Sequence, residues 1–134
     1  MHNIIIIGLP GSGKTTLMNQ FPLHLQFDDF ISTMYDGKLI KERKQQKPVC
    51  ICDPRLCNYE LFKRYIEPHF DPSITEVILF MNDPEKCLRN IKSRDDIIPR
   101  KGVEKTIQKL SLIYNLNKYD KYKIKIYPVF SEEL

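Results

Sequence analysis

The sequence predicts an α/β fold of three layers, in which helices flank a five-stranded parallel sheet. Apolar, strand-like runs alternate with helix-like segments along the chain, and this order is typical of strands joined by helical crossovers. Residues 3–7 and 48–53 are nearly continuous apolar runs, as expected of parallel strands that are buried on both faces. The 134 residues fit one compact domain, so we expect a single domain over residues 1–134.

Turn and cap residues set the expected bounds of the elements. Strands are expected at residues 3–7, 23–27, 48–53, 75–81 and 123–129. Helices are expected at residues 14–20, 59–70, 84–94 and 103–116, with a further helical segment, interrupted at Asp36-Gly37, between residues 30 and 44. Pro68 and Pro72 mark the end of the helix expected at 59–70, and Asp83-Pro84 provides a cap and a first-turn proline for the helix at 84–94.

Composition excludes several classes of protein. The longest apolar runs, IIII and VILFM, are far shorter than the roughly 20 residues of a membrane span. No secretory leader precedes the first strand, so we expect a cytoplasmic protein. The four cysteines lack the paired CxxC spacing of zinc modules and are expected to be buried, reduced thiols. The absence of alanine and the abundance of Ile, Lys and Asn are typical of an AT-rich genome, such as that of a virus or phage.

Residues 8–15, GLPGSGKT, match the phosphate-binding P-loop pattern GxxxxGK[ST]. The match follows a hydrophobic strand and opens a predicted helix, which is the context that phosphate binding requires, because glycines let successive N–H groups face an anion at a helix N-terminus. Lys14 supplies a positive charge to the phosphates of ATP, and the Thr15 hydroxyl can ligate Mg²⁺. The predicted phosphate-binding residues are Gly8, Pro10, Gly11, Ser12, Gly13, Lys14, Thr15 and Thr16.

Acidic residues follow three other predicted strands, at the sheet edge where ligands of open α/β folds bind. Asp53 ends a buried strand and is expected to hold Mg²⁺ or its water; the alternative is a turn-starting residue before Pro54. Asp28 is the candidate general base toward an acceptor hydroxyl, while its neighbour Asp29 either caps the next helix or contacts the acceptor. Asp83 is interpreted as a helix cap.

The segment around residues 94–102 interrupts the strand and helix pattern and is expected to form a short lid. Arg94, at the junction of helix and lid, is the candidate for neutralising charge on the migrating phosphoryl group. The alternative for the cations of this region is a solvated helix face.

This combination resembles the small P-loop kinases, and most closely the kinase domain of phage-type polynucleotide kinases. The resemblance covers GLPGSGKTT at 8–16, the acidic pair Asp28-Asp29, Asp53 after the third strand, and RNIKSR at 89–94. It implies that Asp28 is the general base and Arg94 the transition-state arginine. The family's arginine three residues after the catalytic aspartate is Ile31 here, so Arg55 is the candidate that supplies charge to the acceptor.

The leading hypothesis is therefore an Mg²⁺- and ATP-dependent kinase that phosphorylates a polynucleotide 5′-end or another nucleic-acid hydroxyl. A nucleoside or nucleoside monophosphate acceptor is the alternative within this class, and a P-loop ATPase or a non-catalytic nucleotide-binding regulator is the alternative outside it. The basic stretches 38–47 and 118–127 either track a nucleic-acid backbone or form a solvated helix and a lysine-guarded edge strand.

Overall fold

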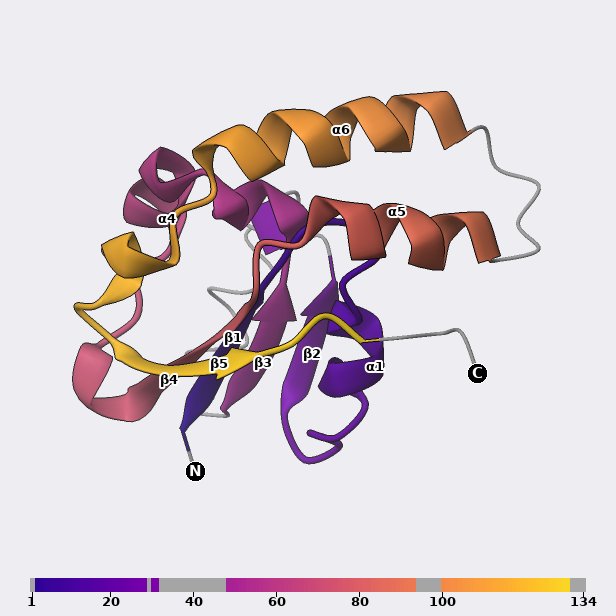
Figure 1. The fold of residues 1–134 in the computed structure, drawn as a ribbon. Helices are drawn as coiled ribbons and strands as arrows, with labels where there is room; N and C mark the ends of the chain where they lie inside the picture. The colour runs from indigo at the N-terminus through magenta and orange to yellow at the C-terminus, as the bar shows by residue number, and fades with distance from the viewer. Residues whose placement is uncertain (1, 29, 32–47, 94–99, 131–134) are drawn as a thin grey trace.

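The protein folds around a five-stranded parallel sheet with the strand order β2-β3-β1-β4-β5 (Figure 1). The computed structural model describes residues 2–28, 30–31, 48–93 and 100–130. Within these residues the strands are β1 (Asn3–Ile7), β2 (Leu25–Asp28), β3 (Val49–Cys52), β4 (Thr75–Phe80) and β5 (Lys123–Tyr127). All four neighbouring pairs are parallel, so the predicted α/β class and parallel sheet are confirmed.

Helices cover both faces of this sheet, as the three-layer prediction required. The α-helices are α1 (Lys14–Met18), α4 (Tyr59–Tyr65), α5 (Pro84–Ser93) and α6 (Arg100–Ile113), and the short 3-10 segments are η1 (Pro54–Cys57), η2 (Pro72–Ile74) and η3 (Leu116–Tyr119). In Figure 1, α1 lies below the sheet, whereas α5 and α6 lie above it. No described helix is both long enough and apolar enough to cross a membrane.

The central strand β1 is buried along its whole length because it contributes to two separate cores. Ile5 and Ile7 belong to the larger core, which joins the sheet to α4, α5 and α6. Ile4 and Ile6 belong to the smaller core, which includes Leu17 and Met18 of α1. The isoleucine run at residues 4–7 is therefore explained by burial on alternate faces.

Some elements differ from their expected bounds for identifiable reasons. Helix α4 ends at Tyr65 rather than near Phe70, since Pro68 has no N–H to continue the helical hydrogen bonds. Strand β2 lies further along the chain than expected and includes Asp28, which pairs in register with Cys52. Helix α6 begins at Arg100 instead of residue 103. The expected helical segment at 30–44 lies mostly outside the described residues.

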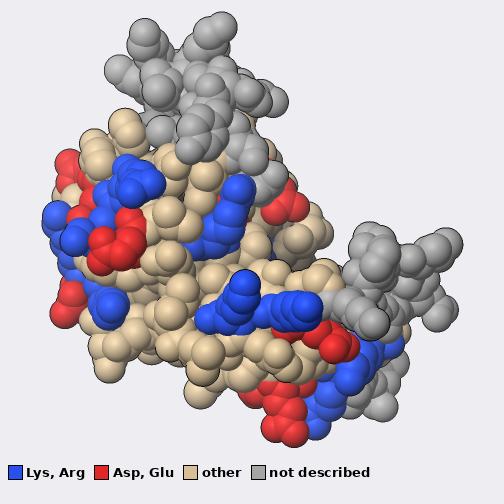
Figure 2. Space-filling view, turned by 90° about the horizontal axis from the view of Figure 1, so that it is seen from above, with Lys and Arg blue, Asp and Glu red and all other residues tan. Residues whose placement is uncertain are grey.

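The cysteines are buried, whereas the described lysines of β5 lie at the surface near a glutamate. Cys50, Cys52, Cys57 and Cys87 are all buried free thiols, as predicted. Lys123 and Lys125 lie 3.5 and 4.0 Å from the same Glu76 carboxylate, so one acidic side chain is shared by two exposed lysines of the edge strand. Figure 2 shows acidic and basic side chains intermixed on the α6 side of the molecule. Most of the basic stretch 38–47 lies outside the described residues.

Three buried tyrosines connect the helical layer to the strands and turns below it. The hydroxyl groups of Tyr114, Tyr119 and Tyr122 donate to the backbone carbonyls of Phe80, Leu56 and Phe70, respectively. Burial raises the pKa of each hydroxyl, and that of Tyr122 rises to about 12. These tyrosines therefore remain neutral hydrogen-bond donors at physiological pH.

We predict that Tyr119→Phe destabilises the fold without changing its shape. The Tyr119 side chain is fully buried and its hydroxyl donates over 2.6 Å, so its loss leaves the Leu56 carbonyl unsatisfied. The free energy of unfolding in urea should fall by about 1–3 kcal/mol. Tyr127→Phe is the matched control, because Tyr127 is 37% exposed and should change stability by less than about 0.5 kcal/mol. Equal losses in the two variants would contradict the role of the buried hydrogen bond.

Candidate nucleotide-binding site

The candidate site lies where β1, β2 and β3 end at one edge of the sheet. Residues 8–13 connect β1 to α1, Asp28 is the last residue of β2, and Asp53 follows β3 directly. Because the three strands are parallel and adjacent, their carboxyl ends meet at this edge. The structure thus brings the P-loop, Asp28 and Asp53 into one region.

The P-loop backbone has the shape of an anion-binding nest. Gly11 and Gly13 have φ values of +84° and +108°, which side chains other than glycine rarely allow. A Cβ atom on Gly11 would lie 2.6 Å from the Cys87 carbonyl oxygen, and one on Gly13 would lie 2.6 Å from Phe130 Cβ. Both glycines are therefore required by conformation and by the close approach of neighbouring segments.

A small polar pocket of about 80 Å³ opens at this nest, lined by Gly11, Gly13, Lys14, Thr15 and Thr16. The first N–H groups of α1 have no intrahelical partner, since each lies ahead of the first helical hydrogen bond, from Leu17 to Gly13. The side chains of Thr15 and Thr16 are exposed to solvent. The pocket thus combines backbone donors, hydroxyl groups and a lysine in a volume suited to phosphate oxygens.

Lys14 folds back onto its own loop. Its side chain is 8% exposed, and its ammonium group donates to the Leu9 carbonyl over 2.8 Å. Burial lowers the pKa of Lys14, while the charge of Asp28 acts in the opposite direction. A phosphate that took the place of the Leu9 carbonyl would provide the full countercharge that the buried ammonium lacks.

Asp28 is exposed at the end of β2 and contacts the strand beside it. The Cys52 thiol donates to Asp28 Oδ1 over 3.3 Å. Burial raises the pKa of this thiol, and the negative charge of Asp28 raises it further, so the thiol stays protonated as a donor. Asp28 and Lys14 both lie at the carboxyl edge of the sheet, at the end of β2 and after the loop that follows β1, the two strands that flank β3.

Asp53 is completely buried and its carboxylate is fully hydrogen-bonded. Oδ1 accepts from the backbone N–H and Nε of Arg55, and Oδ2 accepts from Arg55 Nη2 and the Ile31 N–H, over 2.8 to 3.0 Å. These bonds occupy the lone pairs of both oxygens, so direct coordination of Mg²⁺ by Asp53 would require Arg55 to move. The alternative turn-starting role is present too, since Asp53 caps η1. A role in metal binding stays a prediction.

Arg55 is the second member of this pair. Its side chain is 43% exposed. Nε donates to Asp53 Oδ1 and Nη2 donates to Asp53 Oδ2, so the guanidinium and the carboxylate form a bidentate pair. Ile31, three residues after Asp28, is buried in the core and presents no charged group at this position. The guanidinium group of Arg55, a residue of η1, is therefore held near the backbone of Ile31 by Asp53, which accepts hydrogen bonds from both.

The remaining residues named from the sequence form a helix cap, begin α6 or lie outside the described part of the chain. Asp83 accepts from the Lys86 N–H over 3.1 Å, which confirms its role as a helix cap. Asp29, Arg94 and residues 95–99 of the expected lid lie outside the described residues, and Arg100 to Gly102 form the first turn of α6. Among the described residues, no group of three or more His, Cys, Asp or Glu side chains is placed to hold a metal ion.

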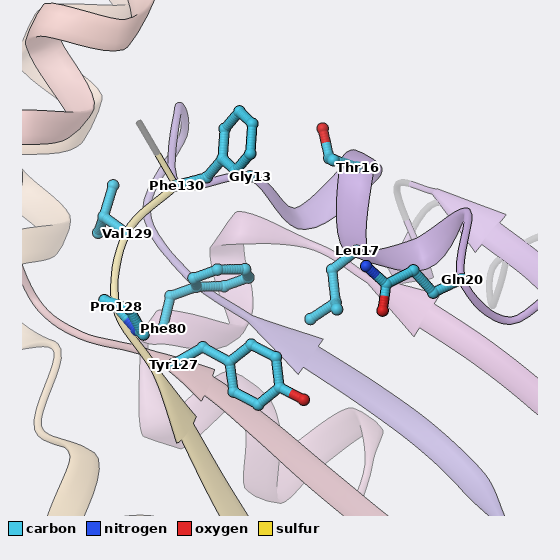
Figure 3. A pocket seen from close by; sticks show the side chains of 9 residues that line it. All are labelled: Gly13, Thr16, Leu17, Gln20, Phe80, Tyr127, Pro128, Val129 and Phe130. Carbon is cyan, nitrogen blue, oxygen red and sulfur yellow. The ribbon is translucent and has the colours of Figure 1, made fainter. Parts of the chain in front are cut away.

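Sequence reasoning missed an apolar pocket beside the P-loop. The pocket has a volume of about 350 Å³ and is lined by Gly13, Thr16, Leu17, Gln20, Phe80, Tyr127, Pro128, Val129 and Phe130. Figure 3 shows Phe130 and Thr16 near Gly13, with Phe80, Leu17 and Tyr127 among the other residues of the wall. Gly13 and Thr16 line both this pocket and the polar one, so the two adjoin.

Sequence reasoning also missed Asn90, a buried residue of α5. Its side-chain amide donates to the carbonyls of Gly11 and Phe130, so it connects the P-loop to the segment after β5. Asn90 lies within RNIKSR at 89–94, but this motif does not reveal its contacts with Gly11 and Phe130, and the apolar pocket likewise depends on segments that are distant in sequence.

Comparison with known proteins agrees with this fold. The structure is similar to the 1.7 Å crystal structure of shikimate kinase from Bacteroides thetaiotaomicron, with a TM-score of 0.54 and 18% sequence identity. The match covers all of this chain and 90% of that chain, and it shows that the fold is that of a P-loop kinase. A likeness to phage polynucleotide kinases in particular is not shown. No protein-family model matches the sequence.

The sequence also has a viral relative of almost the same length. It is 38% identical over 135 residues to the uncharacterized protein R277 of Acanthamoeba polyphaga mimivirus, and the match covers 95% of this chain and 96% of that protein. Identity at this level over nearly the whole of both chains shows common descent, and the chain therefore belongs to the same family as mimivirus protein R277.

Proposed function

We propose that this protein is an ATP-dependent phosphotransferase that moves the γ-phosphate of ATP to a hydroxyl group. The observation that carries this proposal is the placement of a phosphate-sized nest with Lys14 at the end of β1 and of the Asp28 carboxylate at the end of β2. A nest alone explains nucleotide binding. A carboxylate beside it adds a proton acceptor, which transfer to a hydroxyl requires.

Two adjoining pockets support a nucleotide as the phosphate donor. The polar pocket has backbone N–H groups and Lys14 for phosphate oxygens, whereas the larger pocket has aromatic walls for a base. A nucleoside triphosphate has the same two halves, a flat ring system joined to a polyanion. On binding, Lys14 exchanges the Leu9 carbonyl for phosphate oxygens, so the ammonium gains a countercharge where burial disfavours its charge.

The residues of the polar pocket also fit Mg²⁺. This ion uses a few protein oxygens together with substrate phosphates and waters, so a protein cage of several carboxylates is not needed. Thr15 provides an exposed hydroxyl in the pocket, and we propose that it holds the ion, with Asp53 contributing through water or after Arg55 moves. When bound, the ion neutralises phosphate charge and helps orient the phosphates.

Asp28 is proposed as the general base. Its carboxylate accepts the proton of the acceptor hydroxyl, whose oxygen forms a bond to the γ-phosphorus as the bond to the ADP oxygen breaks. The Cys52 thiol donates to Oδ1 and so holds the carboxylate in place. Lys14 binds the charge that develops on the phosphates, and we propose that Arg94 adds a second cation there.

Arg55 and Asp29 are the proposed acceptor-binding residues. Asp53 holds the Arg55 guanidinium in a fixed orientation beside the backbone of Ile31, three residues beyond the proposed base. A guanidinium held in this way suits an acceptor that carries a phosphate or carboxylate group. A nucleotide acceptor and a polynucleotide acceptor are both compatible with such a guanidinium, since each carries phosphate.

Lys14→Met tests the donor site. In the wild type, MgATP at about 100 times its Kd should raise the free energy of unfolding by about 2.7 kcal/mol, and this stabilisation should be lost in the variant. The stability of the ligand-free protein should not fall, since the change removes a buried ammonium whose pKa is lowered by burial. Thermal unfolding with and without MgATP measures both effects.

Lys125→Met is the matched control, because it removes the same charge from an exposed position on β5. It should retain the full response to MgATP. An undiminished MgATP response in Lys14→Met would contradict the proposed donor site.

Asp28→Asn tests the transfer step. We predict that wild-type protein transfers labelled phosphate from ATP to one of four acceptors: nucleosides, nucleoside monophosphates, 5′-hydroxyl DNA or 5′-hydroxyl RNA. The variant should lose at least about 100-fold in kcat, since the general base is removed, while its affinity for ATP stays within about threefold of the wild type.

Asp83→Asn is the control, because asparagine also caps helices well and Asp83 only caps α5. Its activity should match the wild type. Unchanged turnover in Asp28→Asn would refute the base assignment. Hydrolysis of ATP without transfer to any acceptor would indicate an ATPase, and binding without turnover would indicate a regulator.

A further inference from the structure

Asn90 is the buried polar residue that touches both the P-loop and the wall of the apolar pocket. It is 2% exposed, and its Nδ2 donates to the Gly11 carbonyl over 2.9 Å and to the Phe130 carbonyl over 2.5 Å. Both partners are carbonyl oxygens, which only accept hydrogen bonds, so the amide nitrogen rather than its oxygen must face them. Both amide protons thus join segments that are distant in sequence.

A third hydrogen bond closes the connection between the two segments. The Phe130 N–H donates to the Ser12 carbonyl over 3.0 Å, so the peptide group of Phe130 contacts the P-loop while its carbonyl is held by α5. Packing is tight at the same place, because hypothetical Cβ atoms on Gly11 and Gly13 would each lie within 2.6 Å of these neighbours. The P-loop, α5 and residue 130 therefore depend on one another.

These hydrogen bonds fix the orientation of two peptide groups in the P-loop, Gly11–Ser12 and Ser12–Gly13. In a trans peptide the C=O and N–H point in opposite directions. Asn90 holds the Gly11 carbonyl, and the N–H on the other side of that peptide, from Ser12, donates to Leu9. Phe130 holds the Ser12 carbonyl, so the Gly13 N–H points away from Phe130, and Gly13 lines the polar pocket.

We propose that Asn90 is a positioning residue for nucleotide binding, which holds the P-loop in its anion-binding conformation and keeps Phe130 against it. The inference rests on the proposed function, since it assumes that the P-loop binds nucleotide phosphates. Asn90 itself touches neither pocket as a lining residue and acts through the backbone of Gly11 and Phe130.

The structure offers a matched control for this proposal. Asn82 Nδ2 donates to the carbonyls of Ser111 and Tyr114 over 2.9 and 3.0 Å, at the end of α6. Asn82→Leu and Asn90→Leu each remove an amide that donates to two backbone carbonyls, so both should lower the thermal midpoint by comparable amounts. Of these two asparagines, Asn90 donates to the P-loop, whereas Asn82 donates to the end of α6.

The test is calorimetric titration with MgATP, and with inorganic pyrophosphate as a probe of the phosphate site alone, at a temperature where all variants are folded. Asn90→Leu should weaken both ligands by about tenfold, because binding must then restore a P-loop conformation that the two hydrogen bonds no longer hold in advance. Asn82→Leu should bind both ligands like the wild type. If Asn90→Leu does not fold, Asn90→Ser, which keeps one donor, should show a smaller loss in the same direction.

Three outcomes would overturn the inference. Wild-type affinity in the Asn90 variants would show that Asn90 is only structural, and equal weakening in Asn82→Leu would show a general effect of lost stability. Both leave nucleotide binding by the wild type intact, so the proposed function survives them. Failure of the wild type to bind either ligand would remove the proposed function and the inference with it.

Discussion

The burial of β1 on both faces is the constraint on which the rest of the structure depends. Four consecutive isoleucines leave no polar face on this strand, so it must lie inside the sheet with helices above and below it. The observed strand order places β1 between β3 and β4, and the loop after it opens at the middle of the carboxyl edge. A phosphate nest at this point is flanked by neighbouring strand ends and by α5, which supply the groups that surround it.

The buried charged groups of the site have hydrogen-bond partners within the protein itself. The Lys14 ammonium uses a carbonyl of its own loop, and the buried Asp53 carboxylate is satisfied by Arg55 and the Ile31 N–H. A bound polyphosphate changes this balance at Lys14, where it offers charge in place of a dipole. The Lys14 ammonium and the Arg55 guanidinium are held in defined positions by hydrogen bonds within the protein.

Features governed by local pattern could be predicted from the sequence, whereas those that depend on distant contacts could not. The P-loop follows from a contiguous motif, and its helix and strand context follows from apolar periodicity. The expected bounds of β2 begin two residues and end one residue too early, because pairing with β3 rather than the local pattern sets its extent. Asp53 was identified as a strand-end acid, but its saturation by Arg55 and Ile31 is a tertiary arrangement. Asn90 connects residue 11 to residue 130, and no short stretch of sequence contains all three positions.

The proposed function requires that the P-loop backbone binds the phosphates of a nucleotide. The most direct measurement is an NMR titration of ¹⁵N-labelled protein with MgATP, followed by the backbone amide resonances. We predict that MgATP causes its largest saturable shifts at Gly13, Lys14, Thr15 and Thr16, and that adenosine, which has no phosphates, leaves these four amides nearly unchanged. Shifts confined to other regions, or equal P-loop shifts with adenosine and MgATP, would contradict it.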